Sequence, residues 1–375
     1  MNILITVSVR WWNANAYYAI SLAKALSTIG HQVYVAGDPA YPPTSKAQEA
    51  GLETIEIRFA SFNPIVLIYG WYKLFQFVKK KDINIINPHR SEDHFLTALI
   101  AQKFKIPLIR SLGDVRSPKD NFINRWLHLK ITDYHILSSE SSLIRYKSTW
   151  PEFKNSYSII MGGIDGNIFD CSKGKSDVST KLNLPNDTFI VGIVARLSPI
   201  KDHVTFIMAA SLVLEEISNV LFIISGSEEE VFRKDLKSLA KSLNISDQLL
   251  FLDRYEPVNE LMCQFDVGVV ASKGSEVISR VAMEYIATGT PVVATNINVL
   301  PELVKNNHNG FIVPVEDPYS MANAIIRLLQ DNELRDTISK NNIYDFKTKF
   351  DIIGVAKLTA SIYQNLIEKY NILRG

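Results

Sequence analysis

Two acidic residues, Glu276 and Glu284, lie eight positions apart in the largely apolar stretch "GSEVISRVAMEYIATGTPVVAT", residues 274–295. Glu284 falls within a predicted buried helix, where an ionised carboxylate is costly unless it has a partner. If the segment were helical throughout, the two acids would be ~12 Å apart, comparable to the sugar–ribose distance in a sugar nucleotide. A carboxylate can accept two hydrogen bonds from the paired hydroxyl groups of a ribose. We therefore predict that Glu284 faces a ribose and Glu276 a transferred sugar; two solvated helix acids would explain Glu284 poorly.

Two cations, Arg196 and Lys201, follow the apolar run "FIVGIV" in "VARLSPIKDH". Arginine gives forked hydrogen bonds and lysine a point charge, and both suit a phosphate, although a solvated loop is the alternative. The predicted helix "ISRVAMEYIAT", residues 278–288 with Ser279 in its first turn, adds main-chain N–H groups and a favourable dipole. We predict a diphosphate site without a metal, because no Asp-x-Asp pair or His/Cys cluster with ligand spacing occurs. Arg254, in "FLDRY" at 251–255, is a further candidate nucleotide contact.

Strand and helix patterns alternate along almost the whole chain. Short apolar runs alternating with helical segments are typical of parallel sheets covered on both faces. The pattern restarts near residue 163, so we predict two Rossmann-like, doubly wound α/β domains that face a cleft. The predicted domains are 1–163 and 164–351, with a final helix at 352–375 that packs back on the first. Ligands of such sheets bind at the carboxyl ends of the strands.

Bulk composition fits a soluble globular protein of two domains: 375 residues, 47% hydrophobic, 21% charged and a net charge of +1. Near-neutral charge gives no reason to expect nucleic acid as a partner. Cys171 and Cys263 suggest neither a disulfide framework nor a metal cluster, and their scarcity fits a reducing cytosol. "MNILITVS" is predicted to be a first strand rather than a secretory signal. We expect a cytoplasmic protein.

The segment 64–81, "PIVLIYGWYKLFQFVKKK", is the most membrane-like stretch. Lys73 interrupts it, and its apolar part is too short to span a bilayer. An aromatic helix ending in three lysines could rest on the anionic inner face of a membrane. The alternative, which we favour, is a helix packed on a sheet, with lysines stabilised at its C-terminus.

These motifs together resemble glycosyltransferase family 4, the retaining, metal-independent enzymes of the GT-B fold. The family's Glu-x7-Glu signature is matched by Glu276 and Glu284, and its diphosphate-binding cations by Arg196 and Lys201. The resemblance spans nearly the whole chain and includes "LAKALSTIGHQVYV", "GGIDGNIF", "GTPVVAT" and "PELVKNNHNGFIVPVEDP". The glycine-rich turn that the family has after its first strand is here "RWWNANAYY". Asn tolerates left-handed backbone, so Asn13 and Asn15 could keep that turn near the donor phosphates.

The resemblance implies a glycosyltransferase that moves a hexose-like sugar from a nucleoside diphosphate sugar to a hydroxyl of a glycan or glycolipid, as in polysaccharide or lipopolysaccharide biosynthesis. Two alternatives stay open: a sugar-nucleotide epimerase of the same fold, and a non-catalytic nucleotide-sugar-binding protein. A dinucleotide oxidoreductase is disfavoured because no Gly-x-Gly-x-x-Gly joins a strand to a helix. The base, the sugar and the acceptor stay open.

Acceptor-side residues are sought where strands of the first half end. Candidates there are His89, Arg90, Arg110, Asp114 and Arg116, together with Arg10 after the first strand. The carboxyl ends of parallel strands lie along one edge, so the arginines could meet a phosphate or carboxylate of an anionic acceptor. The alternative is internal pairing of these arginines with Glu92, Asp93 and Asp114.

Overall fold

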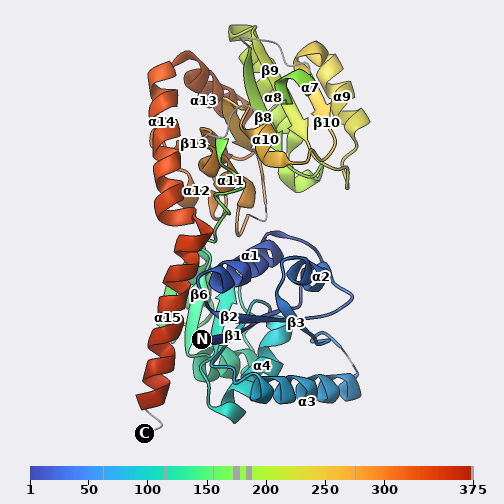
Figure 1. The fold of residues 1–375 in the computed structure, drawn as a ribbon. Helices are drawn as coiled ribbons and strands as arrows, with labels where there is room; N and C mark the ends of the chain where they lie inside the picture. Colours follow the sequence, from blue (N-terminus) through green and yellow to red (C-terminus); the bar gives the residue numbers. More distant parts are fainter. Residues whose placement is uncertain are drawn as a thin grey trace. The chain divides into compact units, whose positions relative to one another are not determined.

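The computed structural model describes residues 1–61, 63–113, 116–154, 156–171, 178–182, 188–274 and 276–372. The chain forms two compact units, of which unit 1 is Met1–Gly163 with Asp351–Gly375 and unit 2 is Ile164–Phe350 (Figure 1). The final helix thus belongs with the N-terminal part of the chain.

Unit 1 is built on parallel strands in two hydrogen-bonded groups, ordered β3-β2-β1-β4 and β5-β6-β7. An isolated parallel bridge between Ile86 and Leu108 joins the two groups at β4 and β5. The strands are β1 Asn2–Val7, β2 Gln32–Gly37, β3 Glu53–Glu56, β4 Ile85–Pro88, β5 Ile109–Leu112, β6 Tyr134–Leu137 and β7 Ser156–Ile159. Strands β3 and β7 were not predicted, because both are four-residue edge strands with mostly half-buried or exposed side chains.

Helices cover both faces of this sheet, with α1 on one side and α3 and α4 on the other (Figure 1). They are α1 Ala14–Thr28, α2 Pro42–Glu49, α3 Pro64–Lys80, α4 Ser91–Phe104, α5 Phe122–Trp126, a π-helical turn Leu127–Ile131, α6 Glu140–Thr149 and α15 Ile352–Ile372. Helix α15 is fixed to this unit by two side-chain hydrogen bonds, Asn87 Nδ2 to Tyr363 Oη at 2.6 Å and Tyr370 Oη to Asp133 at 2.7 Å.

Unit 2 holds a six-stranded parallel sheet in the order β10-β9-β8-β11-β12-β13. Its strands are β8 Phe189–Val194, β9 Val220–Ser225, β10 Leu249–Leu252, β11 Val267–Val270, β12 Val292–Thr295 and β13 Gly310–Val313. The strand order reverses between β8 and β11, which is the position where open α/β sheets bind ligands. The predicted parallel α/β architecture of both halves is confirmed.

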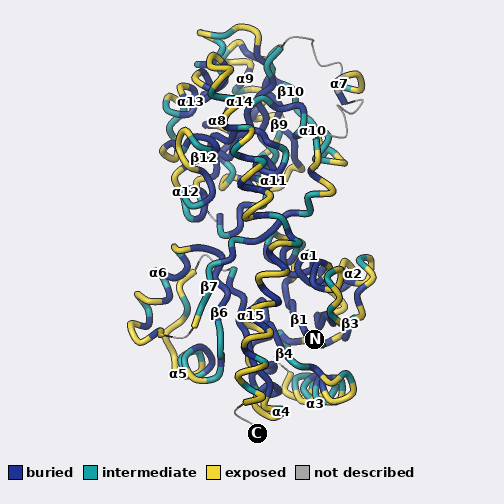
Figure 2. The backbone as a smooth tube through the Cα atoms, turned by 60° about the vertical axis from the view of Figure 1, so that its left-hand side comes forward, coloured by how far each residue is buried: buried dark blue, intermediate teal, exposed yellow. Residues whose placement is uncertain are grey.

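The helices of unit 2 connect these strands and cover the sheet, with α8 and α13 packed on its core. They are α7 Val178–Lys181, α8 His203–Glu216, α9 Arg233–Ser242, α10 Val258–Met262, α11 Arg280–Thr288, α12 Leu300–Leu303, α13 Pro318–Gln330 and α14 Asn332–Asp345. Shorter turns are 3-10 helices at Pro199–Lys201 and Ser246–Gln248 and a π-helical turn at Phe346–Phe350. The strands of both sheets are largely buried (Figure 2).

Cys171 and Cys263 form a disulfide within unit 2. The sequence-based expectation of two separate cysteines was therefore wrong. The two residues are 92 positions apart and match no spacing typical of a disulfide framework, so only the fold brings them together.

No helix within the described residues is long and apolar enough to cross a bilayer.

Candidate donor site

The loops after β8 and β11 bring the predicted site residues of unit 2 to the switch point of the sheet. Arg196 lies two residues after β8, and Lys201 ends the 3-10 turn that follows. Ser272 and Glu276 lie in the loop between β11 and α11. Since β8 and β11 are paired neighbours, these two loops lie side by side at the carboxyl edge.

Lys201, Ser272 and Glu276 form one connected polar group. The Lys201 ammonium pairs with the Glu276 carboxylate, and Ser272 Oγ donates to the same carboxylate oxygen at 2.7 Å. The Glu276 side chain is 4% exposed and that of Lys201 22%, so the pair lies mostly out of water. Lys201 Nζ also lies 3.4 Å from Ser272 Oγ. The arrangement couples the predicted phosphate-binding cation to the predicted sugar-facing acid.

Arg196 takes a different partner. Its guanidinium pairs with Glu229, and 62% of the side chain is exposed. The loop that carries it is fixed against the loop after β9, because Leu197 N donates to Ser227 O at 2.9 Å. Gly226 allows this close approach, since a Cβ there would lie 1.9 Å from Ala195 O. Arg196 is therefore placed near the switch point with its charge accessible to a ligand.

Helix α11 begins at Arg280, later than the sequence predicted. Ser279 is its N-cap, is 1% exposed, and its Oγ has no hydrogen-bond partner among the described residues. Residues 276–279 are not helical, so the ~12 Å separation expected for a continuous helix does not apply to Glu276 and Glu284. Gly289 ends the helix with a left-handed backbone.

Glu284 is a buried acid in an apolar helix, and its partner is Arg280, one helical turn earlier. Arg280 Nε lies 2.8 Å from its carboxylate, and the Glu284 side chain is 4% exposed. Burial raises the pKa of Glu284 to about 7, Arg280 partly opposes this, and nearby Glu256 adds to it. Sequence reasoning missed Arg280, although an i,i+4 pair of opposite charges on a helix is a readable signal.

Arg254 lies in the loop after β10 and pairs with Glu256 through Nε at 2.7 Å, with 69% of its side chain exposed. Because Glu256 acts on the pKa of Glu284, this loop borders the Glu284 end of the site. Arg233, also missed, donates to Gly226 O at 3.2 Å and to Asp253 Oδ1 at 2.8 Å. It thereby joins the loops after β9 and β10.

Asn13 has a structural role in unit 1. Its Oδ1 accepts from Ala16 N at 3.0 Å and caps α1, with an extended backbone at φ −116°. The suggestion that Asn13 and Asn15 supply a left-handed turn was wrong: neither has positive φ, because Asn13 is an N-cap and Asn15 is helical. Asn15 Nδ2 instead donates to His89 O at 3.3 Å and so joins the loops after β1 and β4.

The acceptor-side arginines are mostly paired or buried. Arg110 is 0% exposed and donates to Pro88 O at 2.9 Å and also to Ser111 O. Its prediction as a cleft-facing residue is corrected, since it is fully buried and acts on the pKa values of Asp93 and His94 of α4. Arg90 pairs with Glu92 at 3.4 Å. Arg10 and Arg116 are exposed, while Asp114 lies outside the described residues.

Burial also shifts the pKa values of two groups near Arg110, Asp93 and His89. Asp93 is fully buried, and burial raises its pKa to about 7, opposed by Arg110. His89 is 0% exposed, and burial, followed by Arg110, lowers its pKa to about 3. His89 is therefore neutral at physiological pH and inaccessible to a ligand in this conformation.

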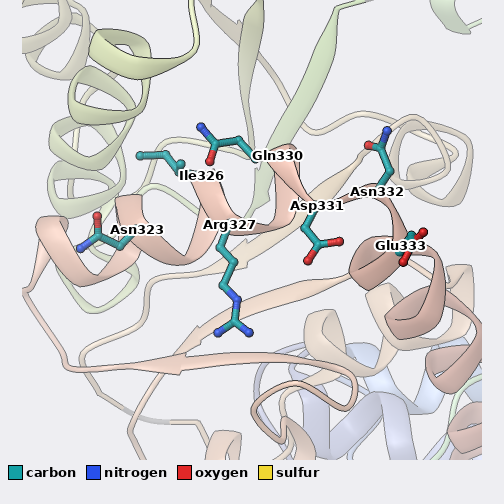
Figure 3. A pocket seen from close by; sticks show the side chains of 7 residues that line it. All are labelled: Asn323, Ile326, Arg327, Gln330, Asp331, Asn332 and Glu333. Carbon is teal, nitrogen blue, oxygen red and sulfur yellow. The ribbon is translucent and has the colours of Figure 1, made fainter.

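A separate hollow lies where α13 meets α14 (Figure 3). It has a volume of about 450 Å³ and is lined by residues that include Arg327, Gln330 and Glu333. Because α13 runs back from the carboxyl end of β13, its own C-terminus lies at the opposite edge of the sheet from Glu276. The hollow is thus distinct from the candidate donor site.

Comparison with known proteins identifies a match in unit 2. Residues 175–344 match the family model "Glycosyl transferases group 1". The chain is 26% identical over 308 residues to the UDP-Gal:alpha-D-GlcNAc-diphosphoundecaprenol alpha-1,3-galactosyltransferase of Escherichia coli, with 78% of each protein covered. It is 27% identical over 265 residues to the D-inositol 3-phosphate glycosyltransferase of Corynebacterium urealyticum, covering 68% of this chain and 62% of that protein.

The fold is also that of solved glycosyltransferases. The crystal structure of HepE from Anabaena in complex with UDP is similar with a TM-score of 0.84 and 20% sequence identity, covering 97% of this chain and 100% of that chain. The predicted GT-B fold is thereby confirmed. The match to the group 1 glycosyltransferase model is thus limited to residues 175–344, and the narrower family 4 assignment stays a prediction.

Proposed function

We propose that this chain is a group 1 glycosyltransferase that moves a hexose-like sugar from a nucleoside diphosphate sugar to a hydroxyl of a glycan or glycolipid acceptor, with retention of configuration. The connected group of Lys201, Glu276 and Ser272 at the switch point carries this proposal. It places a cation for the diphosphate directly beside an acid for the sugar. Glu276 would orient the sugar, and we do not assign it as a nucleophile.

Departure of the diphosphate is the step that these residues would assist. Lys201, Arg196 and the N–H groups at the start of α11 would stabilise its growing negative charge. The Ser279 hydroxyl, which has no hydrogen-bond partner among the residues that the structure describes, could donate to the same group. Since these donors already supply positive charge, we propose that no metal is needed. Turnover should therefore persist in excess EDTA, and complete loss restored by Mn²⁺ or Mg²⁺ would contradict this part of the proposal.

UDP is the nucleotide that the comparisons favour. HepE was solved with UDP, and the Escherichia coli relative is named for UDP-Gal. Thermal unfolding with UDP, GDP, ADP and CDP tests this choice, because a ligand at 100 times its dissociation constant stabilises by ~2.7 kcal/mol. UDP should give the largest shift. Absence of a shift with all four nucleotides would contradict a nucleotide site.

An anionic acceptor is a further part of the proposal. Two relatives are named for a diphosphoundecaprenol and an inositol phosphate acceptor. In this chain Arg10 and Arg116 are the exposed arginines of the predicted acceptor set. Transfer to matched acceptors with and without the anionic group should favour the charged one, and less so at high salt. Equal Michaelis constants, unchanged in Arg10→Ala and Arg116→Ala, would reject it.

The epimerase alternative is less well supported than transfer. It needs an acid–base pair in unit 1, for which His89 and Asp114 are the candidates; His89 is fully buried with a lowered pKa, and Asp114 lies outside the described residues. A cytoplasmic location stays a prediction, and the Cys171–Cys263 disulfide does not favour it, because disulfides are rare in the cytosol.

A further inference from the structure

Helix α3 has two faces of different character. Gly70, Leu74 and Val78 are buried and pack it on the sheet, where a Cβ at Gly70 would lie 3.4 Å from Ile57. This is the sheet-packed helix that the sequence favoured. The opposite face is exposed along its whole length, as the outward side of α3 in Figure 2 shows.

Large apolar side chains fill the first half of the exposed face. Ile65, Ile68, Tyr69 and Tyr72 are 74%, 68%, 66% and 55% exposed. Their spacing of three and four residues places them in one stripe on a helix. Isolated exposed apolar residues are ordinary, but a contiguous stripe indicates an interaction surface.

Positive charge occupies the last turn of the same face. Lys79 and Lys80 are exposed, and neither forms an ion pair within the part of the chain that the structure describes. The 17 residues of α3 include no Asp or Glu. The stripe therefore combines apolar and tyrosine side chains with uncompensated lysines, over a length of about 25 Å.

We infer that this outward face of α3 docks on an anionic membrane surface. Isoleucine side chains would enter the boundary between headgroups and acyl chains, tyrosine rings would lie at the headgroup level, and Lys79 and Lys80 would reach lipid phosphates. The two lysines are the reason to infer an anionic rather than a neutral membrane surface. The idea that docking brings the protein to a glycolipid acceptor in the membrane rests on the proposed function, whereas the docking itself does not.

A second copy of the chain fits this face less well. Because α3 has no acidic residue, a helix pair would place its lysines against apolar side chains or against other lysines in either orientation. Removing charges from water without an opposite partner is unfavourable. A membrane surface leaves the lysines hydrated and provides the opposite charge.

Flotation with lipid vesicles tests the inference in the full chain. We expect wild-type protein to float with phosphatidylglycerol vesicles and to stay behind with phosphatidylcholine vesicles. Lys79→Gln with Lys80→Gln should weaken partitioning about fivefold for each lysine removed. Ile68→Glu with Tyr72→Glu should weaken it by about tenfold or more.

Two matched controls separate docking from general effects. Lys340→Gln with Lys347→Gln removes the same two charges from exposed positions of unit 2 and should leave flotation unchanged. Ile144→Glu introduces an acid at another exposed apolar position of unit 1, on α6, where the side chain is 63% exposed. This variant should also float as the wild type does.

Three results would overturn the inference. The first is wild-type protein that does not float with anionic vesicles. The second is equal flotation of the α3 variants and the control variants. The third is self-association of the wild type that Ile68→Glu with Tyr72→Glu abolishes, which would assign the face to a dimer. UDP binding is measured on every variant: its retention in non-floating variants separates this inference from the proposed transferase activity.

Discussion

Glu284 is the residue whose protonation should control nucleotide binding. Its pKa is raised to about 7 by burial, so it is about half protonated at neutral pH. A carboxylate that accepts hydrogen bonds from ribose must be ionised. We predict that UDP-glucose affinity increases about tenfold between pH 6 and pH 8, following ionisation of a single group.

The variant Glu284→Gln provides the control for this pH profile. Its amide does not titrate, so binding should be weaker and independent of pH in the same range, as measured by calorimetry. The stability term has the opposite sign: because burial raises the pKa of Glu284 from its ordinary value of 4.5 to about 7, the fold loses stability as the pH rises through this interval, and ionisation of Glu284 causes no further loss above it. A flat wild-type profile would show that Glu284 does not bind the ribose as a carboxylate.

Lys201 should contribute to binding through the diphosphate rather than the nucleoside. Lys201→Ala should weaken UDP binding by ~1.5–3 kcal/mol, the range of a charge-assisted hydrogen bond, and leave uridine binding nearly unchanged. Lys273→Ala is the matched control, because Lys273 lies in the loop after β11 and pairs with Glu316 at 2.7 Å, not with Glu276. Equal losses for UDP and uridine, or for both variants, would reject the assignment.

Among the strands, the sequence predicted the central ones better than those at the sheet edges. Continuous apolar runs such as "FIVGIV" mark buried strands directly, whereas β3 and β7 lack such runs. The local sequence pattern also did not reveal that Arg110 is fully buried, since its burial depends on how the rest of unit 1 covers β5. Asn13 is predictable in hindsight as an N-cap.

Gly226 holds the loop after β8 in place through close backbone contact. In Gly226→Ala the new Cβ would lie 1.9 Å from Ala195 O, next to Arg196, so that loop must move. We predict reduced thermal stability together with weaker UDP binding. Gly354→Ala is the control: the nearest atom to its Cβ is 4.0 Å away and the site is helical, so stability should stay equal or rise by ~0.5–1 kcal/mol.

At the scale of the whole molecule, the disulfide was the main feature that the sequence did not predict. Cys171 and Cys263 are 92 residues apart, and a crosslink closing a loop of that length stabilises by ~4–5 kcal/mol in the chain-entropy model. We predict no titratable thiol in the unreduced native protein. Dithiothreitol, or Cys171→Ser with Cys263→Ser, should lower the unfolding temperature. Two reactive thiols in native protein without reductant would contradict the disulfide.

The parallel α/β architecture was readable from sequence, because it depends on short local patterns, whereas the roles of the donor-site residues stay a prediction. The pairings within the site were not readable, because Lys201 with Glu276 and Arg196 with Glu229 join distant parts of the chain. These pairings explain how a nearly neutral protein keeps several charges at one sheet edge without a ligand.

Release of UDP from a nucleotide-sugar donor distinguishes a glycosyltransferase from a protein that only binds the nucleotide sugar. UDP released from UDP-glucose and UDP-galactose would be followed with and without a lipid-linked sugar acceptor, in excess EDTA, for wild type and Glu276→Gln. Glutamine keeps the size of Glu276 but loses the charge that pairs with Lys201. We expect the acceptor to stimulate UDP release by the wild type. The Glu276→Gln variant should still bind UDP but release it from the donor at least about a hundredfold more slowly, because it loses ~3 kcal/mol of transition-state stabilisation. Absence of UDP binding and release in the wild type, or equal turnover by Glu276→Gln, would contradict the proposed function.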